Sequence, residues 1–171
     1  MGNIDLNKLA EELHAAAVEK GFWDVEEAEE KHLAKMISEL GEVVQADRAG
    51  IMYEVERDGA KPEGVVAELA DFVMMLLDLQ NHWGYKFLEE DIESWNKSEY
   101  KEELPKESAY ILASLLAMNL MDSMHFDDDP ILYMVYLPYK WCKGRGYDIW
   151  EIIRQKMEYN KSRPALHGRL Y

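Results

Sequence analysis

Apolar residues recur every three to four positions along most of this chain, and that spacing predicts amphipathic helices. In the first such stretch, Asp5 can cap the helix and Gly21 can end it. The second stretch is long, with a potential cap at Asp24 and an apolar stripe that fades near Gly50. We therefore predict that two helices joined by a short turn form this part of the chain.

A third helix is predicted over about residues 62–83, after a linker at residues 58–62, with Gly84 as its stop. This stretch is apolar on nearly every side, and a helix of that kind belongs in the centre of a bundle. Its acidic residues Glu68 and Asp71 would then be buried at a cost in free energy, which makes them candidates for function.

The rest of the chain is also divided into helix-sized pieces by turn residues. The polar stretch 98–106 is the best internal boundary, and Pro138 is expected to kink the helix that contains it. Asp148 can cap the last helix. The predicted helices cover about residues 88–97, 108–124, 131–143 and 149–162. No segment has the pattern of a strand, so the predicted fold is all-α, a bundle of six or seven helices.

A weak internal repeat suggests a tandem duplication. Residues 84–98 and 146–162 both begin with Gly-Tyr and end with an aromatic residue followed by Asn-Lys-Ser. The single domain 1–171 would then contain a first unit, a degenerate second unit that lacks the acidic pairs, and a tail. These parts are residues 1–97, 106–163 and 164–171. An insertion over residues 85–143 is the alternative explanation.

Composition narrows the class of protein. The chain has 171 residues, 48% of them apolar, so it can bury a sizeable core. Its formal net charge is −15, with 34 acidic and 19 basic residues, which argues against binding to nucleic acid polymers or to a membrane surface. The chain has one cysteine, Cys142, no long apolar run and no segment typical of a signal peptide. We therefore expect a cytoplasmic protein.

Two acidic pairs carry the candidate chemistry: Glu39-Leu-Gly-Glu42 and Glu68-Leu-Ala-Asp71. In each pair the i, i+3 spacing places both carboxylates on one face of a helix. Like charges on a largely apolar face need a neutralising partner, and oxygen ligands without His or Cys favour Mg²⁺, with Mn²⁺ as a possible substitute. Such an ion neutralises phosphate charge and lowers the pKa of a bound water.

Other interpretations of these residues stay open. A lone Glu-x-x-Glu in an acidic chain is usually a solvated helix face, although an almost wholly apolar helix offers no such face. Glu11-x-x-His14 and Glu29-x-x-His32 match the spacing used by carboxylate-bridged di-iron bundles, and this gives a second functional class. A non-catalytic helical assembly module is the third.

The acidic pairs, together with other stretches, resemble the all-α nucleoside triphosphate pyrophosphohydrolases. That superfamily includes MazG-type enzymes, dimeric dUTPases, dCTP pyrophosphatases and phosphoribosyl-ATP pyrophosphohydrolases. The chain is similar to the MazG-like members over about residues 8–84 and 144–171. The matching stretches are Gly21-Phe-Trp-Asp24, Ile37-Ser-Glu-Leu-Gly-Glu42, Glu68-Leu-Ala-Asp71 and the tail Lys156-Met-Glu-Tyr-Asn-Lys-Ser-Arg-Pro-Ala-Leu-His-Gly168.

The resemblance implies hydrolysis of a (d)NTP or a related nucleotide between the α and β phosphates, giving a monophosphate and pyrophosphate. It implies that four carboxylates hold Mg²⁺ and that one of the first pair activates the water. These residues are Glu39, Glu42, Glu68 and Asp71, with Glu39 or Glu42 as the water activator.

The resemblance also implies that Lys156, Asn160 and Arg163 face the phosphates or the sugar. The alternative for Lys156 is an ordinary surface charge near a helix C-terminus. Trp23 is the first candidate for stacking on the base; the alternative is a hydrophobic staple that packs on the second helix. Family members commonly pair their bundles, so a homodimer is expected, with a fused pseudo-dimer acting as a monomer as the alternative.

Overall fold

The structure is a computed structural model that describes residues 4–25, 28–56, 60–97, 109–122 and 130–165. Within these residues the chain forms seven α-helices, so the predicted all-α fold is confirmed. The helices are α1 (Leu6–Glu19), α2 (Glu29–Ala49), α3 (Val65–His82), α4 (Glu89–Lys97), α5 (Ala109–Asp122), α6 (Pro130–Lys143) and α7 (Ile149–Lys161).

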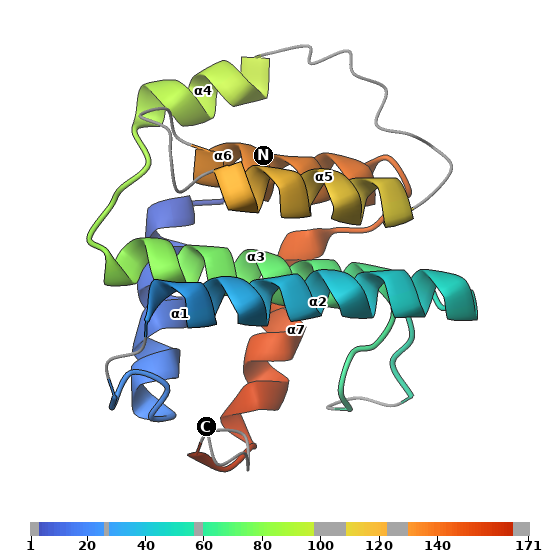
Figure 1. The fold of residues 1–171 in the computed structure, drawn as a ribbon, viewed down its shortest axis with the longest axis horizontal. Coiled ribbons are helices and arrows are strands. Elements are labelled where there is room, and N and C mark those ends of the chain that lie inside the picture. Colours follow the sequence, from blue (N-terminus) through green and yellow to red (C-terminus); the bar gives the residue numbers. More distant parts are fainter. Residues whose placement is uncertain (1–3, 26–27, 57–59, 98–108, 123–129, 166–171) are drawn as a thin grey trace.

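Helices α2 and α3 run antiparallel, side by side, through the middle of the molecule (Figure 1). Helices α5 and α6 form a second layer, in which α5 contacts α2 and α6 contacts α3. Helices α1 and α7 cross α3 steeply and extend away from that layer (Figure 1). One continuous hydrophobic core joins residues from both predicted units, from Leu6 in α1 to Ile153 in α7.

Helix α3 is the centre of this bundle, as its apolar character predicted. It contacts α1, α2, α6 and α7, and most of its side chains are buried. Glu68 is buried with them at 6% exposure. Among the described residues, no helix, α3 included, combines the length and the apolar character needed to cross a membrane.

Two of the three predicted caps are confirmed. The carboxylate of Asp5 accepts a hydrogen bond from the Lys8 N–H at 3.0 Å, and that of Asp148 accepts one from the Trp150 N–H at 3.0 Å. The cap at Asp24 is wrong, because α2 begins at Glu29 with Ala28 as its N-cap and no side-chain cap. The Asp24 N–H bonds to the carbonyl of Gly21, so Asp24 belongs to the turn that closes α1.

The start of α3 is fixed by the loop that precedes it. The N–H groups of Val65 and Val66, which have no partner within the helix, bond to the carbonyls of Ile51 and Met52 at 3.0 and 3.1 Å. The helix therefore begins slightly later than predicted, with Gly64 before it. This arrangement sets the position of the first turn of α3, which carries Glu68.

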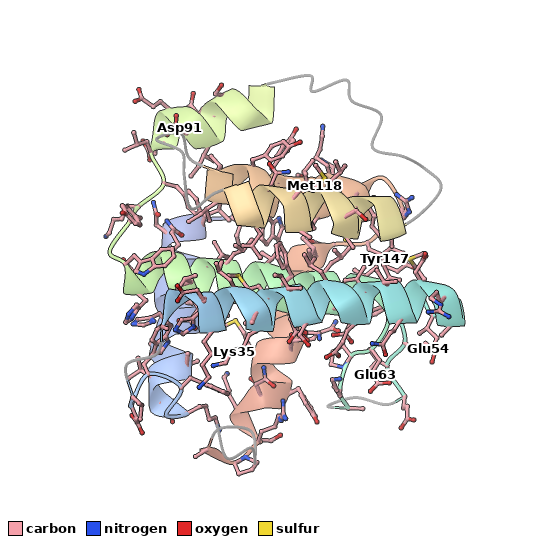
Figure 2. All side chains as sticks on the ribbon, in the orientation of Figure 1. Lys35, Glu54, Glu63, Asp91, Met118 and Tyr147 are labelled. Atoms are coloured by element: carbon pink, nitrogen blue, oxygen red, sulfur yellow. The ribbon has the colours of Figure 1, made fainter. Side chains whose placement is uncertain are left out.

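Gly64 is required at this contact. Its φ of +100° is rarely adopted by residues with a side chain, and a Cβ there would lie 2.9 Å from the Met52 carbonyl. Nearby, Glu54 and Glu63 form an isolated antiparallel bridge across the same loop, where Figure 2 labels both side chains. The loop between α2 and α3 is thus tied to the start of α3 by backbone contacts.

The turns that begin the two copies of the predicted repeat have the same pattern of backbone hydrogen bonds. Tyr85 N–H bonds to the Gln80 carbonyl and Tyr147 N–H bonds to the Cys142 carbonyl, each after a glycine of positive φ. Helices α1 and α2 end in the same way, so this likeness is a general helix stop and does not identify a duplication. The predicted division into units stays a prediction.

Candidate metal centre

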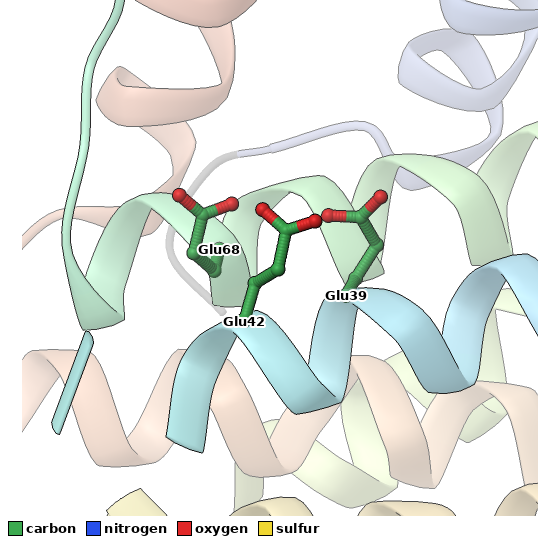
Figure 3. A group of neighbouring side chains, drawn as sticks. All are labelled: Glu39, Glu42 and Glu68. Atoms are coloured by element: carbon green, nitrogen blue, oxygen red, sulfur yellow. The ribbon is translucent and has the colours of Figure 1, made fainter. Parts of the chain in front are cut away.

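Three carboxylates converge between α2 and α3. Ligand oxygens of Glu39, Glu42 and Glu68 all lie within 4.8 Å of one another. Figure 3 shows Glu39 and Glu42 rising from α2 toward Glu68 on α3, with the carboxylate of Glu42 between the other two. Because α2 and α3 pack side by side, one turn of α2 supplies two ligands and the first turn of α3 supplies the third.

Glu68 carries an oxygen that needs a partner. Its side chain is buried, and within the described part of the chain its Oε2 atom has no hydrogen-bond partner. The Lys156 ammonium group lies 3.9 Å from this oxygen, which is too far for a hydrogen bond. A buried carboxylate oxygen that accepts no hydrogen bond from the described residues and lies beside two other carboxylates fits a site for a cation.

The crowding of these groups perturbs their proton affinity. The pKa of Glu39 is raised from 4.5 to about 7, first by burial and then by the negative charges of Asp71, Glu42 and Glu68. The pKa of Glu68 is also raised to about 7, chiefly by burial, with Lys156 acting in the opposite direction. Without a cation, the centre therefore favours bound protons at neutral pH.

Asp71, the fourth predicted ligand, is not part of the group of three. Its carboxylate forms a short ion pair with the ammonium group of Lys156, which reaches α3 from α7. Asp71 still lies close enough to Glu39 to raise the pKa of that residue. The structure thus brings the four predicted acids to one place, three facing one another and the fourth held by a lysine.

The donor set suits a hard divalent cation. The three ligands are carboxylate oxygens, the type that Mg²⁺ and Mn²⁺ prefer, and Oε2 of Glu68, which accepts no hydrogen bond from the described residues, offers a buried ligand atom. In the described part of the chain, this is the one cluster of three or more acidic, His or Cys side chains close enough to share an ion.

Three residues of the di-iron alternative, Glu11, His14 and His32, have other partners, whereas the side chain of Glu29 lies outside the part of the chain that the structure describes. Glu11 pairs with Lys86 at 3.3 Å, and His14 Nδ1 lies 2.7 Å from an Asp78 carboxylate oxygen. His32 stacks on Trp23. Glu11, His14 and His32 do not join the cluster of Glu39, Glu42 and Glu68, which contains no imidazole among the described residues.

The residues predicted to bind phosphate or sugar lie on or just beyond α7. Lys156 is only 3% exposed, so its interpretation as an ordinary surface charge is wrong, whereas Lys161 is an exposed lysine paired with Glu158. Asn160 lies one helical turn beyond Lys156 and is partly buried. The guanidinium of Arg163 lies 5.8 Å from the ring centroid of Tyr159. Of these residues, Lys156 contacts the acidic centre, through Asp71 and Glu68.

Trp23 belongs to a second polar cluster that the sequence did not reveal. Its ring stacks on His82 and His32, with centroids 3.7 and 4.7 Å away, and its Nε1–H donates to Asp78 at 3.1 Å. His14 lies against the same Asp78 carboxylate, whose pKa burial raises. The one available signal was the position of Asp78, an acidic residue on the mostly apolar α3, two turns from Asp71.

This cluster lies along the same helix pair as the acidic centre. His32 precedes Glu39 on α2 by two turns, and Asp78 follows Asp71 on α3 by two turns. Because the helices are antiparallel, the Trp23 cluster is displaced from the carboxylates by about 10 Å along both. Lys20, the residue that follows α1, donates to the carbonyls of Lys161 and Arg163, so the C-terminal ends of α1 and α7 meet.

Comparisons with protein-family models, with curated proteins and with solved structures found no match to this chain.

Proposed function

We propose that this chain is a divalent-metal-dependent nucleoside triphosphate pyrophosphohydrolase. It would cleave a (d)NTP or a related nucleotide between the α and β phosphates to give a monophosphate and pyrophosphate. The observation that carries the proposal is the cluster of Glu39, Glu42 and Glu68, in which the buried Oε2 of Glu68 accepts no hydrogen bond from the described residues. A scaffold without a ligand would gain stability by losing these charges.

The carboxylates would hold Mg²⁺, which would neutralise charge on the triphosphate and lower the pKa of water at the site. Glu68 is the most buried of the three and is suited to a fixed ligand role. Glu39 and Glu42 are less buried, so either can accept a proton from the attacking water.

Side chains on and just beyond α7 would also contact the substrate, in addition to the metal bound by the carboxylates. Lys156 already lies beside the acidic centre and supplies a point charge there. Asn160 follows it by one turn, and Arg163 carries a guanidinium suited to bidentate contact with phosphate. In a chain of formal net charge −15, this basic segment beside the carboxylates favours an anionic substrate.

The base would reach toward the Trp23 cluster. The Trp23 cluster is displaced from the carboxylates by about 10 Å, a distance that a triphosphate and a sugar can span. Trp23 already stacks on His82 and His32, so a base would bind at the edge of this cluster or replace one of the imidazoles. The Asp78 carboxylate beside it can accept hydrogen bonds from an exocyclic amino group.

A nucleotide panel tests the proposal. The purified protein is incubated with each (d)NTP in Mg²⁺ or Mn²⁺, and pyrophosphate and monophosphate are quantified against an EDTA control. We expect pyrophosphate from at least one nucleotide, only with metal, and none from Glu42→Gln protein of unchanged circular dichroism. Orthophosphate instead of pyrophosphate, or no product from the whole panel, would refute the proposed reaction.

A further inference from the structure

Lys156 is a cation buried within the acidic centre. Its side chain is 3% exposed, its ammonium group is paired with Asp71, and it lies 3.9 Å from Glu68 Oε2. A buried ammonium group is stable only when it is paired, so it must stay with these carboxylates unless another charge replaces them. Lys161 lies five residues further along α7, and its side chain is 69% exposed.

The positions of the carboxylates and the charge of Lys156 set how many divalent cations the acidic centre can bind. Three carboxylates share one space, and their oxygens lie within 4.8 Å of one another, close enough to ligate a single ion. A second divalent ion would need Asp71 as a ligand, but Lys156 holds that carboxylate. The buried Oε2 of Glu68 accepts no hydrogen bond from the described residues and lies 3.9 Å from the Lys156 ammonium group, so it is available as a ligand of that ion.

From this arrangement we infer that Lys156 takes the place of a second metal ion and limits the centre to one divalent cation. Glu39, Glu42 and Glu68 bind that cation, and Asp71 acts as a positioning residue that holds Lys156. This inference rests on the proposed function only in that the carboxylates bind a divalent cation. It requires neither a nucleotide nor hydrolysis.

The test is the number of Mn²⁺ ions bound per chain. Metal-free protein is titrated with Mn²⁺, and the free ion is measured by electron paramagnetic resonance up to saturation. We expect one ion per chain in the wild type and two in Lys156→Met, because the neutral side chain of similar length releases Asp71 as a ligand. Lys161→Met, which changes an exposed lysine on the same helix, should still bind one ion.

Two ions in the wild type, or one ion in folded Lys156→Met protein, would overturn the inference. If the single variant does not fold, the double variant Lys156→Met/Asp71→Asn is used in its place. It removes both partners of the buried pair and so leaves no unpaired charge. It should bind one ion, and two would show that Asp71 does not hold the second. Two ions bound by Lys156→Met, together with no pyrophosphate release from any nucleotide by the wild type, would support the inference and refute the hydrolase.

Discussion

Replacing Glu39 with Gln should stabilise the metal-free protein above neutral pH. The folded protein raises the pKa of Glu39 from 4.5 to about 7, mainly through burial. A displacement of that size corresponds to roughly 3.4 kcal/mol when the folded carboxylate is fully ionised. Glu39 is only partly buried, so water screens part of this cost, and we expect a gain of about 1 to 2 kcal/mol.

The sign of the effect depends on pH. Because the folded state binds this proton more tightly than the unfolded state, the wild type loses stability as pH rises from 4.5 to about 7. Below the unfolded value both states are protonated, so the contribution of Glu39 is retained in full. The advantage of Glu39→Gln should therefore be near zero below pH 4.5, grow through this interval and level off above it.

Urea unfolding in EDTA, followed by far-UV circular dichroism at several pH values, measures this difference. Glu12→Gln is the control, because its carboxylate is exposed and lies 4.0 Å from Lys8, an ion pair worth less than about 1 kcal/mol. Excess Mg²⁺ should reverse the order, since the wild type gains binding energy that the variant lacks. A variant less stable than the wild type in EDTA at alkaline pH would refute the electrostatic reasoning.

Two further predictions concern other parts of the fold. Gly64→Ala should lower the free energy of unfolding by about 1 to 3 kcal/mol, because a Cβ at φ +100° meets the Met52 carbonyl. Gly41→Ala is the control: it has nothing near its Cβ and should raise the free energy of unfolding by about 0.5 to 1 kcal/mol. Thermal melts of both variants check this, and equal melting temperatures would contradict it. Trp23→Leu should raise KM for the nucleotide about tenfold with a smaller change in kcat, since a stacking surface is lost. An unchanged KM in folded protein would remove Trp23 from the proposed nucleotide site.

Local signals in the sequence predicted the helices well, because caps and stops act over a few residues. Asp5 and Asp148 cap their helices, and a glycine of positive φ follows α2 at Gly50. The burial of α3 was predictable because it has almost no polar face. Asp24 failed as a cap because α2 begins only at Glu29, so Asp24 lies in the turn at the end of α1 and not at the start of α2. The sequence pattern did not decide between these two local structures.

The acidic centre was predictable only in part. The i, i+3 spacing placed each pair on one helix face, but the role of Asp71 depends on Lys156, which lies far along the chain and contacts it only through the packing of α7 on α3. The Asp78 and Trp23 contact likewise joins separate segments. Periodicity carries no information about such pairings, because any polar residue on the right face would satisfy the pattern.

The position of Lys156 in the sequence also has a consequence for biosynthesis. Its partner Asp71 precedes it by 85 residues, so the ribosome completes α2 and α3 well before α7 emerges. Until then, the acidic side chains between α2 and α3 lack the ammonium group that pairs with Asp71 in the folded protein. The nascent chain must keep them hydrated, protonated or bound to a metal ion, and the docking of the last helix closes the centre.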